Sequence, residues 1–287
     1  MHRRTLLRLT ALGALGAGSA LAGCSKEDEP VTRDDEPTPP PGRERHTYGE
    51  DPSQYGELFL PRAEPRGVVV VIHGGFWRSE YAADDLGTPL AEALAEEGWA
   101  AWNLEYRRVG GGLGSGGGAP QTFDDVAAGI DRLAELDLDL DLSTVVTLGH
   151  SAGGHLATWA AARGAHGWDE RVPVTHVISQ AGVLDLRAAD AEGLGGDAVR
   201  GLLGHAPTAD DARFDPAQQL PLDVPVWCVH AQGDANVPFS QSVEYVERAT
   251  AAGAQAELVE VEGDHFTVID PASTAWARQV EILDGIG

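Results

Sequence analysis

The sequence predicts an α/β protein, with a mostly parallel central sheet and helices on both faces. Three runs, 67–75, 144–149 and 225–230, are apolar along most of their length instead of at alternate positions. A strand that meets helices on both sides buries both sets of side chains and has this continuous pattern. Segments with helical periodicity separate the runs, and strands that alternate with helices favour a parallel sheet.

The expected elements follow one another from about residue 54. A first strand is expected in QYGELFLP, and strands and helices then alternate to the end of the chain. Further strands are expected at 67–75, 99–107, 144–149, 174–182, 225–230 and 257–262, and helices at 90–98, 122–136, 152–163, 240–252 and 271–284. Two segments interrupt the alternation: a glycine-rich run at 109–121, expected to be a loop, and a Pro- and Asp-rich insertion at about 186–224.

Composition limits the partners of the protein. The 287 residues suit one domain of ordinary size, and their formal net charge is −25. This charge repels nucleic acid and anionic membrane surfaces, so neither is expected as a partner. No group of His, Asp and Cys residues has the spacing of metal ligands, and the glycine-rich run lacks the Gly-Lys-Ser/Thr ending of a phosphate loop. We therefore expect no metal and no cofactor.

The first 23 residues have the parts of a signal peptide. Arg3 and Arg4 form a positive start, residues 6–21 are mostly apolar, and the sequence Leu-Ala-Gly-Cys ends at Cys24. This ending resembles a bacterial or archaeal lipobox, so residues 1–23 are expected to be removed and Cys24 to carry lipid. The alternative is an ordinary secretory signal with a cysteine at this place by chance. The paired arginines also resemble a twin-arginine export signal.

The charged, proline-rich residues 24–45 are expected to form a flexible tether, because this composition cannot bury a core. The folded domain is then expected at 46–287. These features predict an exported, cell-surface lipoprotein that contacts the membrane only through the lipid on Cys24. No later run approaches the roughly 20 apolar residues of a membrane-spanning helix. Cys228 lies in an apolar run and is expected to be a buried core residue.

Ser151 lies between an expected strand and an expected helix, in the pentapeptide Gly149-His150-Ser151-Ala152-Gly153. The pattern G-x-S-x-G is typical of a serine nucleophile on a sharp strand-to-helix turn. The same pattern also arises by chance in a glycine-rich chain, and the serine would then be an ordinary turn residue. A catalytic assignment therefore requires a base, an acid and an oxyanion-binding site elsewhere in the chain.

Oxyanion-binding N–H groups are expected after the first buried strand, in the segment HGGFW (73–77). Glycine lets the main chain approach a reacting group without a Cβ atom in the way. Gly75 and Phe76 are the predicted donors from this loop, and the N–H of Ala152, directly after the serine, is the third. The alternative is a simple turn at the end of a strand.

Asp234 and His265 supply the remaining groups. Each follows an expected strand, in HAQGDANVP and in VEGDHFTVID. His265 is predicted as the base and Asp234 as the acid that orients its ring, which gives the chain order serine, acid, histidine. The alternative for Asp234 is a turn residue, since GDAN is good turn chemistry.

Two other acids and several other histidines compete for these roles. Asp185 follows an earlier strand, and Asp264 is disfavoured because adjacent side chains rarely face each other. His150 and His155 flank the serine and are poorer candidates for the base. His230 ends a strand and is expected to be a packed neighbour of the site.

The motifs HGGFW, GHSAGGHLA, QAGVLDLR and GDHFTVID resemble those of the kynurenine formamidase-like and small-molecule carboxylesterase branch of the α/β-hydrolase superfamily. The resemblance covers roughly residues 46–287. It implies the α/β-hydrolase fold, a triad of Ser151, Asp234 and His265, an oxyanion hole in HGGFW, and a place outside the triad for Asp185. The chain differs from this family in its predicted location at the cell surface, because a tryptophan-catabolic formamidase is expected inside the cell.

The sequence therefore predicts a surface-anchored serine hydrolase that cleaves small carboxylic esters through an acyl-enzyme. One alternative is an arylformamidase that acts on N-formylkynurenine-like formamides, and another is a non-catalytic binding lipoprotein. Short acyl groups are expected, because the insertion at 186–224 is highly charged and has few large apolar residues. The pocket is expected to be bounded by Phe76, Trp77 and the glycine-rich loop at 109–118. The sequence does not indicate an oligomeric state.

Overall fold

The computed structural model describes residues 42–286, apart from the side chain of Asp84. The predicted signal peptide, the predicted lipid site at Cys24 and almost all of the predicted tether lie outside the described residues. Between residues 42 and 286, no helix is long and apolar enough to cross a membrane.

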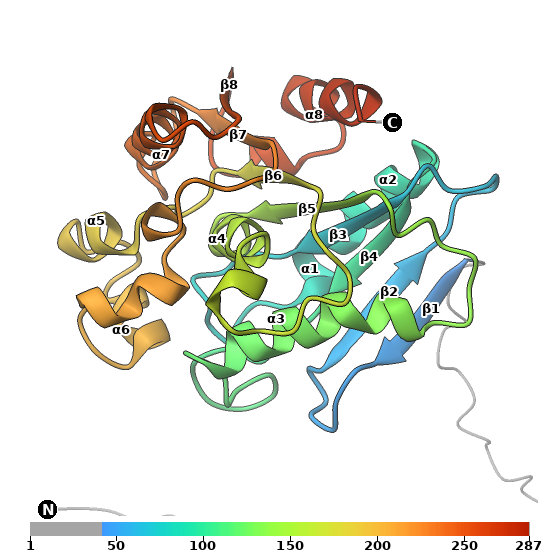
Figure 1. The fold of residues 1–287 in the computed structure, drawn as a ribbon, viewed down its shortest axis with the longest axis horizontal. Helices are drawn as coiled ribbons and strands as arrows, with labels where there is room; N and C mark the ends of the chain where they lie inside the picture. The colour runs from blue at the N-terminus through green and yellow to red at the C-terminus, as the bar shows by residue number, and fades with distance from the viewer. Residues whose placement is uncertain (1–41, 287) are drawn as a thin grey trace, which may run out of the picture. The chain divides into compact units, whose positions relative to one another are not determined.

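The described chain contains an eight-stranded sheet in the order β1-β2-β4-β3-β5-β6-β7-β8 (Figure 1). The β1–β2 and β2–β4 pairs are antiparallel, and every pair from β4–β3 to β7–β8 is parallel. The strands are β1 (Arg43–Thr47), β2 (Tyr55–Phe59), β3 (Val68–Ile72), β4 (Ala100–Leu104), β5 (Val145–His150), β6 (His176–Gln180), β7 (Val226–Ala231) and β8 (Ala256–Val261). The predicted α/β-hydrolase fold with a mostly parallel sheet is confirmed.

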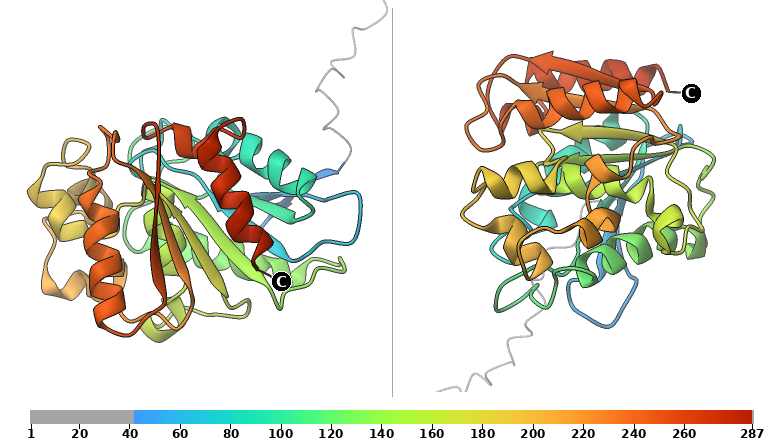
Figure 2. Two further views of the ribbon diagram at one scale, coloured as in Figure 1. Left: turned by 90° about the horizontal axis from the view of Figure 1, so that it is seen from above. Right: turned by 60° about the vertical axis from the view of Figure 1, so that its left-hand side comes forward.

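Helices cover both faces of this sheet (Figure 2). On β3, Val68, Val70 and Ile72 join the core under α3, α4 and α7, while Val69 and Val71 join the core under α2 and α8. The helices are α1 (Ala83–Leu86), α2 (Thr88–Glu96), α3 (Gln121–Asp131), α4 (Ala152–Ala160), α5 (Leu186–Ala191), α6 (Ala198–Leu203), α7 (Ser240–Ala251) and α8 (Thr274–Asp284), with 3-10 turns η1 (Arg132–Glu135), η2 (Arg163–His166), η3 (Ala209–Phe214), η4 (Pro216–Gln218) and η5 (Thr267–Ile269). This two-sided burial is why the central strands are apolar throughout.

The fold begins earlier than the predicted boundary at residue 46. Strand β1 starts at Arg43, so residues 43–45 belong to the sheet and not to the tether. The Arg45 guanidinium forms an ion pair of 2.7 Å with Glu57 on β2, and Arg43 pairs with the same carboxylate. The sequence alone shows these arginines only as a continuation of the charged tether, because their partner lies more than ten residues away.

The insertion at 186–224 is an ordered, helical segment that packs onto the core beside β6 and β7. It contains α5 and α6, which lie next to each other in Figure 1, followed by η3 and η4. Among its large apolar residues, Leu194, Leu202 and Leu203 are buried. The insertion therefore turns its few leucines inward.

Candidate active site

The predicted catalytic residues follow strands at the carboxyl edge of the parallel sheet, where sites form in open α/β folds. Ser151 directly follows β5, HGGFW follows β3, Asp234 follows β7 and His265 follows β8. The parallel pairing of these strands in the order β3-β5-β6-β7-β8 brings the four loops to one side of the sheet. The sequence had placed each of these residues after a strand, and the structure agrees.

Ser151 occupies a strained turn between β5 and α4. Its backbone has φ 55° and ψ −118°, a conformation that non-glycine residues rarely adopt. Three backbone hydrogen bonds hold it: its N–H donates to the Gln180 carbonyl at 2.8 Å, and its carbonyl accepts from His155 at 3.1 Å and from Val183 at 3.3 Å. The neighbouring strand and helix thus fix the buried serine on a sharp strand-to-helix turn of the kind that is typical of a nucleophile.

The glycines of the pentapeptide are required by close backbone contacts. A Cβ atom on Gly153 would lie 2.0 Å from the Ile72 carbonyl oxygen and 2.5 Å from that of His73. A Cβ atom on Gly149 would lie 2.1 Å from the Gly153 carbonyl oxygen. Helix α4 therefore starts against the end of β3, and this contact sets the serine beside the HGGFW segment.

Asp234 and His265 form a direct hydrogen bond. Nδ1 of His265 donates to Oδ2 of Asp234 at 2.6 Å, and both side chains are almost completely buried. Since Nδ1 carries the proton in this bond, the Nε2 atom of the neutral ring is left as an acceptor. The two residues have the relation of an orienting acid to a catalytic base.

The Asp234 carboxylate is held in its charged form by four donors. Oδ1 accepts from the N–H groups of Asn236 and Val237, each at 2.8 Å, and Oδ2 accepts from His230 at 3.1 Å in addition to His265. Burial alone would raise the pKa of this carboxyl, but the hydrogen bonds from His230 and His265 outweigh burial and hold the pKa well below its usual range. Asp234 is therefore negatively charged at neutral pH.

His230 is fully buried, and it contacts the acid directly. Its Nδ1 accepts from the Ser242 hydroxyl at 2.8 Å, which leaves the Nε2 proton for Asp234. The sequence indicated a packed histidine here but not this contact. The signal was present only as a spacing, because His230 lies near the end of β7, four residues before Asp234.

His150 joins the serine turn to the histidine loop. Its Nε2 donates to the backbone carbonyl of His265 at 2.9 Å, and the two imidazole rings lie 4.4 Å apart. Burial, with a further contribution from the nearby His265, lowers the pKa of His150 to about 3. His150 is thus a neutral structural residue, and its expected unsuitability as the base agrees with this geometry.

The HGGFW segment forms a second strained turn. The Arg78 N–H donates to the Gly75 carbonyl at 2.9 Å, and the two residues between them, Phe76 and Trp77, have φ 54° and 55°. Two positive φ values in succession are the mark of a type I′ turn, which Asn and Gly normally occupy. For bulky residues this conformation costs about 1–2 kcal/mol each.

The HGGFW turn and the serine turn together leave three N–H groups available as donors. The N–H groups of Gly75, Phe76 and Ala152 donate to no other group among residues 42–286. The preceding Gly74 lies directly on the serine turn, since a Cβ atom there would be 3.1 Å from the Cβ of Ser151. Free N–H groups beside a nucleophile can bind the oxyanion of a tetrahedral intermediate.

Trp77 does not line the pocket, contrary to the sequence-based expectation. Its side chain is 0% exposed, and its indole N–H donates to Nδ1 of His155 at 3.2 Å. A type I′ turn points successive side chains in different directions, so the side chains of Phe76 and Trp77 have different surroundings. Phe76 is half-buried and packs on Gly195 of the insertion. In the glycine-rich loop, the side chain of Leu113 is 79% exposed to solvent.

The competing acids have other partners. Asp185 caps α5 by accepting from the N–H groups of Arg187 and Ala188, and it pairs with Arg248 at 2.7 Å. Asp264 accepts from the N–H groups of Phe266 and Thr267 within its own turn. Their carboxylates therefore serve local structure, while the Asp234 carboxylate contacts His265.

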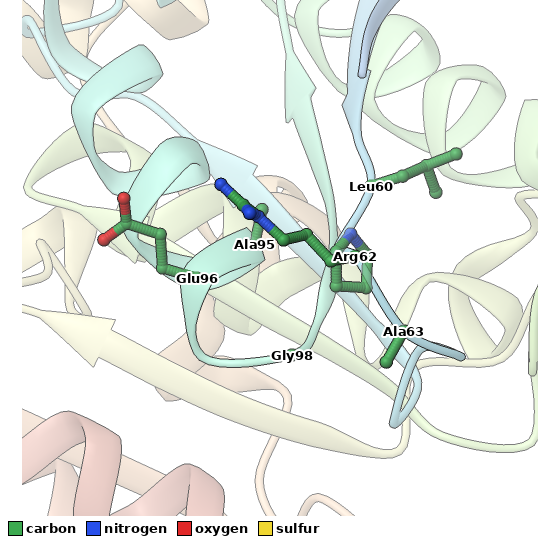
Figure 3. Close-up of a pocket in the computed structure, with 7 residues that line it drawn as sticks. Leu60, Arg62, Ala63, Ala95, Glu96 and Gly98 are labelled. Carbon is green, nitrogen blue, oxygen red and sulfur yellow. The ribbon is translucent and has the colours of Figure 1, made fainter. Parts of the chain in front are cut away.

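Two cavities lie at different places relative to the carboxyl edge of the parallel sheet. One of about 390 Å³, lined by Arg62, Glu96 and their neighbours, lies where β2 ends and β4 begins (Figure 3). Because β4 runs parallel to β3, this is the amino edge of the parallel strands, away from Ser151. Another, of about 440 Å³, lies between the insertion and the acid loop, and Gly195 and Asp234 are among its lining residues. Of these two cavities, only the second has a predicted catalytic residue in its lining, and that residue is Asp234; Ser151 and His265 do not line it.

Comparison with known proteins identifies a family. The sequence pattern of the BD-FAE family, an α/β-hydrolase esterase family, matches residues 57–248. A probable isoprenylcysteine alpha-carbonyl methylesterase of Oryza sativa subsp. japonica is 25% identical over 252 residues, which cover 77% of this chain and 56% of the rice protein. The chain thus spans about half the length of that relative.

Solved structures have the same fold. A truncated carbohydrate esterase from gut microbiota superposes with a TM-score of 0.68 at 19% identity, covering 84% of this chain and 94% of its own. Esterase 2 of Thermogutta terrifontis, solved after phosphonylation by sarin, is 25% identical with a TM-score of 0.68, covering 85% and 94%. The same esterase, solved with propionate bound, is 25% identical with a TM-score of 0.67, covering 85% and 93%.

Proposed function

Because this chain belongs to the BD-FAE family, we propose that it is a serine esterase that cleaves small carboxylic esters. The observation that carries the proposal is the hydrogen bond of 2.6 Å between His265 Nδ1 and Asp234 Oδ2, on the same sheet edge as the strained Ser151 turn. A buried acid that orients a histidine, on the same sheet edge as a serine with free N–H groups nearby, supports the acid–base pair and nucleophile that acyl transfer requires. The reactivity of the Thermogutta esterase with sarin supports a serine mechanism at 25% identity.

The proposed reaction proceeds in two halves. Oγ of Ser151 attacks the acyl carbon while Nε2 of His265 takes its proton, and the N–H groups of Gly75, Phe76 and Ala152 bind the oxyanion. The intermediate collapses, His265 gives the proton to the leaving alcohol, and the acyl group stays on Ser151. Water then attacks the acyl-enzyme with the same histidine as base, which releases the acid and restores the serine.

The substrate is proposed to be small and its acyl group short. The insertion buries Leu194, Leu202 and Leu203, so these residues offer no apolar face to a lipid surface. The propionate bound to the Thermogutta esterase supports a short acyl group. Hydrolysis of N-formylkynurenine, the reaction of the branch that the motifs resemble, has no such support.

The proposed location is the outer cell surface, through export and lipid attachment at Cys24. This part of the proposal depends on the sequence of residues 1–24 alone: positive start, apolar run, and cysteine after Leu-Ala-Gly. Labelling of cells with a radioactive or clickable fatty acid tests it. The wild-type chain should take up label and the Cys24→Ser variant should not, and equal labelling of the two would refute lipidation.

The enzymatic proposal is tested with a fluorophosphonate probe and a series of p-nitrophenyl esters from acetate to palmitate. The probe should label the wild-type protein at Ser151 and leave Ser151→Ala unlabelled. The value of kcat/KM should be highest between acetate and butyrate. A maximum at decanoate or longer would contradict the small pocket, and a much higher value for N-formylkynurenine than for every ester would assign the chain to the formamidases.

A further inference from the structure

Two residues of the recognised motifs are not used by the proposed mechanism. Trp77 ends HGGFW, and His155 lies four residues after Ser151 on α4. Both side chains are 0% exposed, so neither can touch a substrate. They contact each other, with the indole N–H of Trp77 donating to Nδ1 of His155 at 3.2 Å and the two rings at an interplanar angle of 88°.

His155 is fixed in one tautomer by a second partner. Its Nε2 lies 2.8 Å from the Phe214 carbonyl oxygen, which can only accept, so Nε2 carries the proton and Nδ1 is the acceptor for Trp77. Burial lowers the pKa of His155 to about 4, which keeps the ring neutral and this acceptor intact. One imidazole thus joins the HGGFW turn, the helix of the nucleophile and the insertion.

The HGGFW turn needs such external support. Phe76 and Trp77 both have positive φ, which local sequence does not favour, and residues in sparsely populated conformations persist only where their surroundings over-determine them. The backbone supplies one bond within the turn and one from Val109 to the Trp77 carbonyl. The side chains supply the rest, with Phe76 packed on Gly195 and Trp77 bonded to His155.

We propose that the Trp77–His155 hydrogen bond holds the HGGFW turn in its oxyanion-binding shape, which makes both residues positioning residues for the transition state. The proposal rests on the proposed esterase function. If the bond is lost, the turn can relax toward negative φ at Phe76, and its N–H then rotates away from the position of the oxyanion. Ground-state substrate does not carry that negative charge, so the loss should appear in kcat and not in KM.

The first test compares two buried tryptophans. Trp77→Phe removes the indole N–H that binds His155. Trp159→Phe is the matched control, because Trp159 is also 0% exposed and its indole N–H donates to one acceptor, the Arg213 carbonyl, at 3.0 Å. Removal of a full oxyanion donor costs about 100- to 1000-fold in kcat, so a displaced donor should cost about tenfold or more. We expect this loss for Trp77→Phe with KM within about threefold of wild type, and a kcat within about threefold for Trp159→Phe.

The second test separates the two bonds of His155. In His155→Asn the amide oxygen takes roughly the place of Nδ1, so the acceptor for Trp77 is kept and the bond to Phe214 is lost. In His155→Gln the amide nitrogen takes roughly the place of Nε2, so the bond to Phe214 is kept and the acceptor for Trp77 is lost. We expect His155→Asn to keep a kcat at least about threefold above that of His155→Gln, which is about half, in free energy, of the tenfold loss expected from a displaced donor.

Equal losses of kcat in Trp77→Phe and Trp159→Phe, or a loss that lies wholly in KM, would overturn the proposal. So would a kcat for His155→Gln equal to or above that of His155→Asn, and this pair decides the question if Trp77→Phe does not fold. Ser151→Ala is measured in the same series. Wild-type activity in that variant would refute the proposed serine mechanism itself, which keeps the two failures distinct.

Discussion

The two strained turns of the site are stabilised in different ways. Around Ser151, the strain is held by the backbone, through three hydrogen bonds to Gln180, His155 and Val183 and through glycines that admit close contacts. Around Phe76 and Trp77, two bulky residues adopt positive φ, and distant side chains hold them there. Backbone groups of the adjoining strand, helix and loop hold the serine turn, whereas the HGGFW turn depends on contacts that the side chains of Phe76 and Trp77 make with other elements.

This difference predicts how each turn fails. A change in the serine turn should either remove the chemistry or disrupt the fold, because sheet and helix meet there. A change in the supports of the HGGFW turn should leave the fold in place and impair the transition state, as proposed for Trp77 and His155. The following predictions test the two modes, from the largest effect to the smallest.

Ser151→Ala should lower kcat by about 10⁴- to 10⁶-fold without loss of folding, because it removes the nucleophile and leaves the backbone bonds of the turn intact. Hydrolysis of p-nitrophenyl acetate and circular dichroism are the measurements. A folded variant that retains more than about a tenth of the wild-type rate would exclude Ser151 as the nucleophile.

Asp234→Asn should lower kcat by about 10⁴-fold, because an amide in place of the carboxylate favours the wrong tautomer of His265. Asp185→Asn is the control, since Asp185 caps α5 and pairs with Arg248. It should leave kcat nearly unchanged and lower the free energy of unfolding by at most about 1 kcal/mol, because asparagine caps a helix as well as aspartate does and only the ion pair with the exposed Arg248 is lost. The assignment fails if the folded Asp185 variant loses turnover while the Asp234 variant keeps it.

Gly153→Ala should lower the free energy of unfolding by about 3 kcal/mol or more, because the new Cβ atom would meet two backbone oxygens that cannot move independently of the sheet. Gly201→Ala is the matched control. Its Cβ atom would meet only a Val109 methyl group at 3.7 Å, so the better helix propensity of alanine should stabilise α6 by up to about 1 kcal/mol. Urea denaturation of both variants measures the difference, and equal destabilisation would contradict the role of Gly153.

Much of the fold and of the candidate site was predictable from the sequence, because the signals for both lie within short stretches of the chain. The central strands carry continuous apolar runs because both faces are covered, and Ser151, Asp234 and His265 each follow such a strand. Information of this kind lies within a few residues. The predicted donors Gly75, Phe76 and Ala152 belong to the same class, since a turn after a strand indicates them.

The errors and omissions concern contacts between distant residues. The boundary at residue 46 was wrong because Arg43 and Arg45 pair with Glu57 across two strands. The pocket role expected of Trp77 was wrong because its partner is His155 on another element. The bond from His230 to Asp234 was missed, although the two residues are only four apart, because nothing in the sequence shows that their loop turns back.

The insertion that supports the HGGFW turn should weaken as pH rises from about 4 to about 7. Asp215, next to Phe214, accepts from the Leu186 N–H and is almost fully buried, and burial raises the pKa of its carboxyl from 3.8 to about 7. An acid with a raised native pKa binds more protons in the folded chain, so its neutral form stabilises below the unfolded pKa and this advantage is lost as pH rises through the folded pKa.

Asp215→Asn has a neutral side chain at every pH and isolates this effect. It should unfold with nearly the wild-type free energy at pH 4 and be more stable than wild type at pH 8, by a difference on the order of 3 kcal/mol. Chemical denaturation at pH 4 and at pH 8 gives the difference in free energy of unfolding between variant and wild type at each pH. A difference that does not change with pH would mean that Asp215 titrates as an ordinary exposed carboxyl.

The smallest expected effect measures the strain at Ser151 itself. Glycine adopts positive φ without a Cβ penalty, whereas alanine keeps the penalty of serine. Ser151→Gly should therefore be more stable than Ser151→Ala by about 1 kcal/mol, even though glycine gains more entropy on unfolding. The order should reverse at an unstrained, exposed helix position such as Glu244 on α7. There the free energy of unfolding of Glu244→Ala should exceed that of Glu244→Gly by about 1 kcal/mol. If alanine is the more stable residue at both positions, the backbone at Ser151 stores no strain, and its geometry is set wholly by the three hydrogen bonds around it.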